Sequence, residues 1–85
     1  MIASKHRRTL EAVFTRPVSA NIAWRDIEAL FEAFGATVKY GDGSRVHVLL
    51  NGKVATFHRP HPRPHTDKGA VAAVRDFLAS AGIRP

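Results

Sequence analysis

The spacing of apolar residues predicts two helices in the first part of the chain. Apolar positions recur at helical intervals over residues 5–14, and Pro17 ends that helix because proline disfavours helix at the preceding residue. A longer apolar stripe over residues 24–34 predicts a second helix, with acidic residues in its first turn. Gly35 follows where a left-handed C-terminal cap is expected.

A third helix is predicted near the end of the chain, over residues 70–81. Thr66 is the expected N-cap, and Gly82 is expected to end the helix. The segment 59–65 before it holds three prolines and is expected to be an extended loop. The residues expected to face the core are Val71, Val74, Phe77 and Leu78.

Three strands are predicted between the second and third helices, at residues 36–40, 44–50 and 53–58. Glycine-rich residues 41–43 indicate the first turn, and Asn51-Gly52 is typical of a two-residue hairpin loop. The predicted order is α-α-β-β-β-α within one domain, residues 1–85. We therefore expect an α+β fold, a small three-stranded antiparallel sheet with helices on one face.

The Asn51-Gly52 loop also fixes the strand register and so sorts side chains between the two faces of the sheet. Leu50 then pairs with Lys53, and the alternate pairs below it are apolar and face the helices. In the first hairpin, pairing of Tyr40 with Ser44 places Lys39 opposite Arg45 and Thr37 opposite His47. The open face is expected to carry Lys39, Arg45, His47 and His58, continued by Arg59 and His61.

Charge and composition narrow the possible partners. The chain has 13 Lys and Arg against 7 acidic residues, a formal charge of +6, which favours nucleic acid or an acidic protein as partner. It has no cysteine, so disulfides, thiolate zinc sites and cysteine nucleophiles are excluded. No apolar run approaches the roughly 20 residues of a membrane span, and no signal peptide is evident. We expect a cytoplasmic protein without membrane contact.

The open face combines cations with imidazoles, which suits the binding and the cleavage of RNA. Lys and Arg bind backbone phosphates. Attack by the 2′-hydroxyl of RNA needs a general base, a general acid and a cation, and histidine titrates in the right range for the proton transfers. This route needs no metal. The alternative without function is a sheet face that is exposed to solvent, on which Lys, Arg and His have no catalytic role.

Other site chemistries find little support in the sequence. His58, His61 and His65 have the spacing of a helical metal site, but the prolines between them forbid the helix. No elbow motif surrounds Ser44, and no glycine-rich phosphate loop precedes a helix. We expect no metal and no cofactor. The residues interpreted as core and not as a base-stacking platform are Trp24, Phe31, Phe34, Phe57 and Phe77.

The order of these segments resembles the HicA-type mRNA interferase toxins. The resemblance rests on the helix ending at Phe34-Gly35-Ala36, on Gly43-Ser44 before a strand, on the two-residue hairpin, and on His61-Pro62 before the last helix. It covers the chain from about Trp24 to the C-terminus. It implies a fold similar to double-stranded RNA-binding domains, metal-independent cleavage of mRNA, and neutralisation by a HicB-type antitoxin.

The resemblance also directs attention to the residues after Gly43-Ser44. The family usually places histidine there, whereas this chain has Arg45 and Val46, with His47 next. We expect His47 to act as general base, and His58 or His61 as acid. Lys39, Arg45 and Arg59 are the expected phosphate contacts. Two other functions remain open: an RNA-binding module without catalysis, and a basic domain that binds an acidic protein. His6 and His65 receive no role.

Overall fold

The computed structural model describes residues 2–60 and 64–85. His61 therefore lies outside the described residues. The elements are α1 (Ser4–Phe14), α2 (Trp24–Ala33), β1 (Thr37–Tyr40), β2 (Arg45–Leu50), β3 (Lys53–His58) and α3 (Lys68–Ser80). Their order, α-α-β-β-β-α, confirms the predicted α+β fold.

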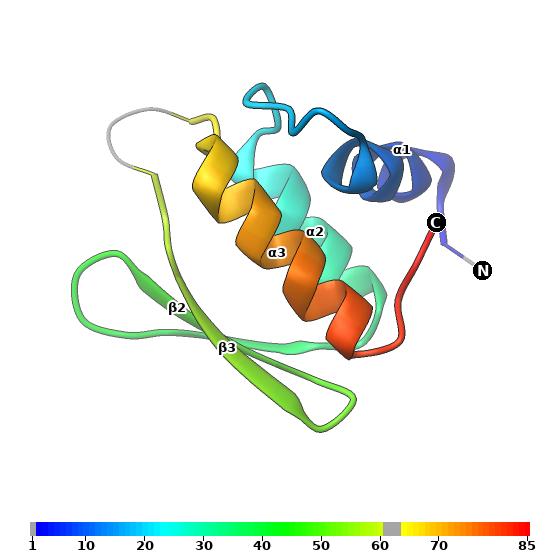
Figure 1. Ribbon diagram of the computed structural model, residues 1–85. Helices are drawn as coiled ribbons and strands as arrows, with labels where there is room; N and C mark the ends of the chain where they lie inside the picture. The colour runs from blue at the N-terminus through cyan, green and yellow to red at the C-terminus, as the bar shows by residue number, and fades with distance from the viewer. Residues whose placement is uncertain (1, 61–63) are drawn as a thin grey trace.

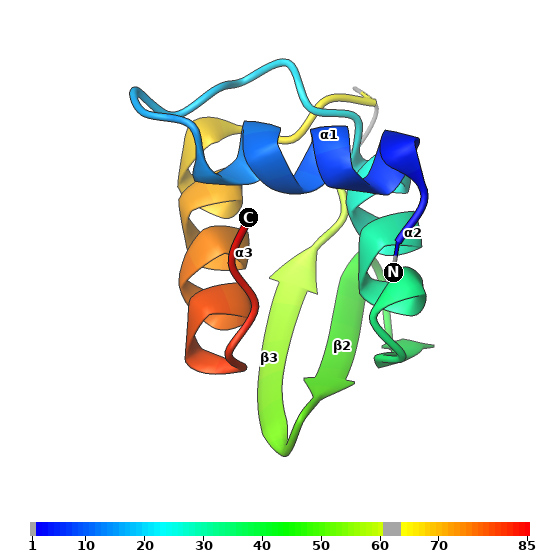
Figure 2. The ribbon, with the colours of Figure 1, turned by 90° about the vertical axis from the view of Figure 1, so that its right-hand side faces the viewer.

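The molecule is layered, with the sheet on one side and the helices on the other. The sheet is antiparallel in the order β1-β2-β3, and α2 and α3 lie over the same face of it (Figure 1). Helix α1 crosses α2 and α3 on the side remote from the sheet (Figure 2). One face of the sheet is therefore left without a covering helix.

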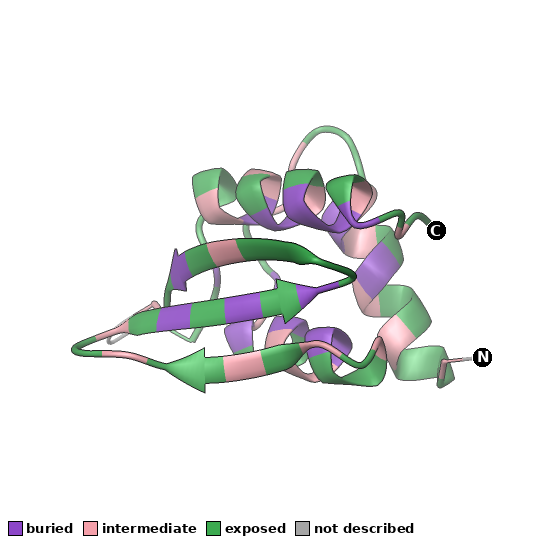
Figure 3. Cartoon of the chain, turned by 90° about the horizontal axis from the view of Figure 1, so that it is seen from below, coloured by how far each residue is buried: buried purple, intermediate pink, exposed green. Residues whose placement is uncertain are grey.

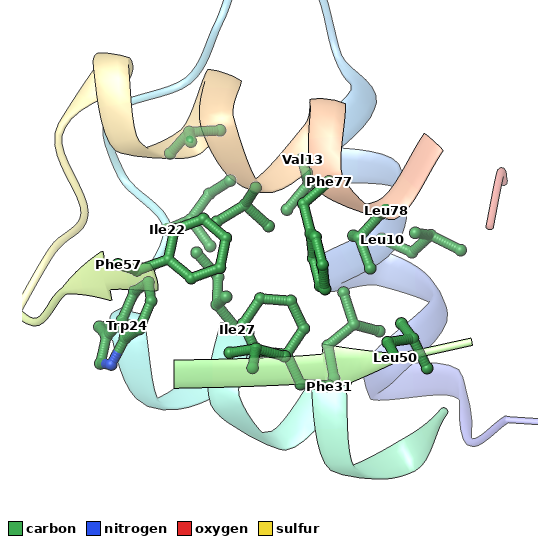
Figure 4. Packing of buried hydrophobic residues seen from close by; sticks show 14 of the residues in the cluster. Leu10, Val13, Ile22, Trp24, Ile27, Phe31, Leu50, Phe57, Phe77 and Leu78 are labelled. Atoms are coloured by element: carbon green, nitrogen blue, oxygen red, sulfur yellow. The ribbon is translucent and has the colours of Figure 1, made fainter. Parts of the chain in front are cut away.

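The core fills the space between the sheet and the three helices. Alternation along β2 turns Val46, Val48 and Leu50 inward, and all three are buried. An aromatic cluster lies above them, in which the Phe31 and Phe57 rings stack at 5.7 Å between centroids (Figure 4). The other buried members of this cluster are Trp24 and Phe77. Phe34 packs against the core but is only partly buried.

The helix ends follow the prediction except at the start of α3. Gly35 and Gly82 both adopt φ +84°, the left-handed conformation expected after a helix. The predicted N-cap at Thr66 is wrong, because the Asp67 side chain accepts the hydrogen bond from the Ala70 N–H at 2.8 Å. Thr66 is buried, and its N–H donates to the Ile22 carbonyl at 2.8 Å. Because Thr66 is held by this contact with the segment before α2, the N-cap of α3 is the next residue, Asp67.

The second hairpin has the register that the sequence predicts. Asn51 (φ 51°) and Gly52 (φ 80°) both adopt positive φ, as this two-residue turn requires. Leu50 pairs with Lys53, His47 with Thr56, and Arg45 with His58. The Asn51 Nδ2 group donates to the Ala81 carbonyl at 2.8 Å, so the turn is also tied to the end of α3.

The predicted register of the first hairpin is wrong by two residues. Lys39 pairs with His47 instead of Arg45, and Thr37 pairs with Leu49 instead of His47. The loop has the expected length, but it spans residues 42–44 instead of 41–43. The Gly41 N–H donates to the Arg45 carbonyl at 2.9 Å, so pairing extends to Gly41. A shift of two residues preserves the faces, so Lys39 and His47 still share the open face.

Candidate nucleic-acid interface

The uncovered face of the sheet carries the side chains that alternate with the core. Figure 3 views this side, where exposed and buried residues alternate along the central strand β2. Three cross-strand rows result. One holds Thr37, Leu49 and Val54, the next holds Lys39, His47 and Thr56, and the last holds Gly41, Arg45 and His58. The polar chemistry is therefore concentrated in two adjacent rows.

His47 occupies the centre of the middle row and is held by its neighbour on β3. Its Nδ1 lies 2.9 Å from the Thr56 hydroxyl oxygen. Where Nδ1 carries the proton and donates to Thr56, Nε2 keeps its lone pair and is able to accept a proton. Where the hydroxyl donates instead, Nε2 carries the proton and acts as a hydrogen-bond donor.

Gly41 gives the His47 ring the room that it occupies. A Cβ atom at position 41 would lie 2.8 Å from His47 Nε2 and 3.5 Å from Arg45 Cβ. The first of these distances is shorter than any normal contact between such atoms, so a side chain at position 41 would displace the imidazole. The glycine-rich turn therefore has a second consequence besides chain reversal, which is to leave the space that the His47 ring occupies.

Cations and a second imidazole surround His47. Lys39 faces it directly from β1, and Arg45 and His58 face each other in the adjoining row. His58 is a diagonal neighbour of His47 on the adjacent strand, and such neighbours lie roughly 7–8 Å apart. All four side chains belong to exposed residues. The sequence-predicted grouping of Lys39, Arg45, His47 and His58 on one face is present in the structure.

Arg59 does not continue this face, contrary to the prediction. Its N–H donates to the Ser44 carbonyl at 2.7 Å, and its guanidinium lies 4.9 Å from the centroid of the Tyr40 ring. Tyr40 points to the helix side, because it pairs with the buried Val46. Side chains alternate between the two faces along an extended chain. Arg59 follows the core residue Phe57 by two positions, so its side chain points to the helix side as well.

The Tyr40 hydroxyl lies in an acidic environment on that side. Interaction of the hydroxyl with the Glu28 side chain raises the pKa of Tyr40, with smaller contributions from burial and from the charges of Glu28 and Glu32. The positive charge of Arg59 opposes this shift of the pKa. The Tyr40 phenol therefore keeps its proton at physiological pH.

Two features of the surface were not anticipated from the sequence. The outermost row exposes apolar side chains, with Leu49 45% and Val54 72% accessible. The same alternation that predicts His47 on the open face would have placed Leu49 there. The second feature is a pocket on the helix side that includes Trp24, Glu28 and Arg59. No pattern in the sequence indicates this pocket, because its residues come from three separate segments.

Residues 2–60 and 64–85 contain no group of three His, Asp or Glu side chains placed to hold a metal ion. None of the helices found there is long and apolar enough to cross a membrane.

The comparison with known families identifies the chain. Residues 24–83 match the model of a family described as the HicA toxin of bacterial toxin–antitoxin systems. The chain belongs to the HicA family. Searches of curated proteins and of solved structures gave no match. The matched HicA segment begins at the start of α2 and ends at Ile83. It therefore contains α2, the whole sheet and α3.

Residues 1–23, which include helix α1, precede the HicA segment and carry half of the net charge of +6. Residues 1–23 hold 4 Lys and Arg and 1 acidic residue, a net charge of +3. The matched residues 24–83 hold 8 Lys and Arg and 6 acidic residues, a net charge of only +2. Leu10 and Val13 of α1 are nevertheless buried in the common core. This HicA chain is thus a single packed unit with a basic helix outside the family segment.

Proposed function

We propose that this HicA-family protein is a metal-independent endoribonuclease that cleaves mRNA. His47 Nε2 takes the proton of a 2′-hydroxyl, and the oxygen attacks the adjacent phosphorus. The bond from phosphorus to the 5′-oxygen breaks, and that oxygen takes a proton from His58 or His61. The products are a 2′,3′-cyclic phosphate and a 5′-hydroxyl, so atoms and charge balance without a metal or a redox partner.

The observation that carries this proposal is the setting of His47. Its Nδ1 lies 2.9 Å from the Thr56 hydroxyl oxygen, and its Nε2 occupies the space that Gly41 leaves by having no side chain. Lys39 stands directly opposite, and Arg45 lies in the next row. These two cations supply the charge that holds a phosphate and stabilises the negative charge that develops on it. Arg59 lies beside Tyr40 on the helix side, and there it contacts a neighbouring phosphate of the RNA strand at the end of the sheet.

A HicB-type antitoxin is the proposed inhibitor, and the same face is its proposed binding site. The family is one of toxin–antitoxin pairs, so a protein partner belongs to its biology. Acidic groups on the partner would pair with Lys39 and Arg45 and cover His47. The exposed Leu49 and Val54 adjoin this patch and offer an apolar contact for the partner.

The decisive experiment measures cleavage of a transcript by the purified full chain in the presence of a chelator. We expect cleavage with cyclic phosphate ends, and a loss of at least about a hundredfold in His47→Ala, the scale of a general base. His65→Ala is the matched control, because His65 is exposed and lies outside the proposed site. Cleavage that is unchanged in His47→Ala would reject the assigned base, and cleavage that needs a divalent metal would reject the mechanism.

A second candidate function, RNA binding without cleavage, is compatible with the same contact between His47 and Thr56. If the Thr56 hydroxyl donates to His47 Nδ1, then Nε2 carries a proton and binds phosphate but does not accept a proton. Salt-sensitive binding of the transcript without any cleavage would support this function. Tight binding of an acidic antitoxin, with neither RNA binding nor cleavage, would instead indicate a protein-interaction domain.

A further inference from the structure

An open pocket of about 600 Å³ lies at the end of the sheet where β1 and β2 are joined, on the helix side. The first turn of α2 forms one wall, with Trp24, Arg25 and Glu28. Ser44 and Arg59 form part of the other wall. Because Arg45 follows Ser44 directly, the pocket begins where the row of Arg45 and His58 on the open face ends.

Two buried polar atoms belong to residues that line this pocket, and neither has a partner within residues 2–60 and 64–85. They are the indole Nε1 of Trp24, a donor, and Oε2 of Glu28, an acceptor. Trp24 is 4% exposed, and its ring nitrogen lies on the side away from the Phe31 and Phe57 rings (Figure 4). Residues four apart on a helix lie on the same face, so Trp24 and Glu28 line the pocket one helical turn apart.

These two atoms define the chemistry of an occupant. Buried polar groups in proteins nearly always have a hydrogen-bond partner, so the pocket is complementary to a ligand with an acceptor beside a donor. A phosphate does not fit beside Glu28, because two negative charges repel each other at short range. The Watson–Crick edge of a nucleobase presents an acceptor next to an N–H donor. The pocket volume accommodates a purine or a pyrimidine.

We infer that this pocket binds one unstacked base of the RNA strand whose backbone lies on the open face. The base accepts a hydrogen bond from Trp24 Nε1 and donates one to Glu28 Oε2. Arg25 and Arg59 are both exposed at the rim, where they reach the phosphates on either side of that base. The inference rests on the proposed RNA function and adds a site that reads sequence, separate from the site of cleavage.

Base preference is the property that this site would control, and a random RNA pool measures it without cleavage. The full chain carrying His47→Ala is incubated with the pool, and the retained RNA is sequenced. We expect enrichment of one base at a single position. Adding Trp24→Phe removes the N–H donor together with part of the ring, and adding Glu28→Gln removes the charge and replaces one acceptor oxygen with an NH2 donor. Each should reduce the enrichment roughly three- to tenfold, the effect of one lost hydrogen bond.

Glu32→Gln provides the matched control, because Glu32 is an exposed acid one turn further along α2 and does not line the pocket. It should leave the enrichment intact. Trp24 is the only tryptophan in the chain, so its fluorescence reports directly on occupancy of the pocket. Binding of the retained RNA should change this fluorescence, and thermal unfolding of each variant should remain cooperative.

The outcomes separate this inference from the proposed function. RNA binding with a base preference that is unchanged in both Trp24→Phe and Glu28→Gln would overturn the base-binding pocket and leave the RNA function standing. RNA binding without any change in Trp24 fluorescence would also overturn it. Absence of RNA binding and of cleavage in the wild-type chain would instead reject the proposed function itself, and with it this deeper inference.

Discussion

His47 and Thr56 face each other across the β2–β3 ladder, with 2.9 Å between the imidazole Nδ1 and the hydroxyl oxygen. This hydrogen bond holds the imidazole ring in one orientation and so sets the direction of Nε2, whichever of the two partners donates. It therefore links a structural feature of the sheet, the register set by the Asn51-Gly52 turn, to the proposed chemistry of Nε2.

Replacement of Thr56 by valine tests this link. The change keeps the shape and β-propensity of the side chain but removes the hydroxyl, so His47 loses its orienting partner. We expect cleavage to fall by roughly tenfold, which corresponds to about 1.4 kcal/mol, in line with the loss of one hydrogen bond. Rates of transcript cleavage under single-turnover conditions measure the effect. Equal rates in Thr56→Val and wild type would show that the contact does not position the base.

Gly41→Ala tests the space at His47 Nε2. The added Cβ would meet that nitrogen at 2.8 Å, so the ring must move and its productive geometry is lost. We expect a loss of cleavage with little change in the thermal unfolding midpoint, since Gly41 does not carry a positive φ. The same change in the His47→Ala background should have no further effect. A comparable further loss in that background would mean that Gly41 acts through another residue.

Lys39 and Arg45 should act as phosphate contacts on the open face. For single-stranded RNA, each such contact adds about 0.7 to the slope of log affinity against log salt concentration. We therefore expect Lys39→Ala and Arg45→Ala each to flatten that slope by about this amount in binding titrations. Lys68→Ala is the control, because Lys68 is an exposed residue at the start of α3, away from the face. An identical slope in all three variants would remove the open face as the RNA path.

The Tyr40 phenol should titrate above its ordinary pKa of about 10, because Glu28 stabilises the protonated form. Tyr40 is the only tyrosine, so ultraviolet absorbance reports its ionisation without overlap from another phenol. Glu28→Gln should lower the pKa of Tyr40 towards the ordinary value. Since the folded-state pKa is raised, the contribution of this group to stability is present below pH 10 and is lost as pH rises through the folded value. An unchanged titration in Glu28→Gln would contradict the proximity of the two side chains.

Helix α1 should be essential to the stability of this chain, although it lies outside the matched HicA segment. Leu10 is 4% exposed and contacts the common core, so Leu10→Ala should lower the free energy of unfolding by about 2–5 kcal/mol. Urea unfolding followed by circular dichroism measures the change. Arg7→Ala on the exposed side of α1 serves as control and should change it by less than about 0.5 kcal/mol. A small effect of Leu10→Ala would contradict the predicted contribution of α1 to stability.

Much of the fold was predictable because local signals agreed with one another. Helical periodicity in α2, the left-handed glycine after it and the Asn51-Gly52 turn each depend on a few neighbouring residues, and each is present in the structure. The register of the second hairpin followed from its turn. The register of the first hairpin did not, because a loop with two glycines permits pairing to begin at either of two adjacent residues.

The position of the α3 cap likewise depended on a distant contact. Thr66 has the side chain of a good N-cap, but its backbone is bonded to Ile22 and its side chain is buried. Asp67 takes the cap as a result. Sequence reasoning lacks access to such a contact, because its two partners lie more than 40 residues apart.

The amino-acid sequence alone was enough to predict the order of elements, the resemblance to HicA toxins, and the shared face of Lys39, Arg45, His47 and His58. These follow from periodicity and turn chemistry, which are properties of short segments. The tertiary structure was needed to show that His47 faces Lys39, that its ring is bonded to Thr56 and lies over Gly41, and that Arg59 turns to Tyr40. The pocket of Trp24 and Glu28 also required it. The reason is physical: such contacts join segments distant in sequence, and their geometry is set by packing of the whole chain.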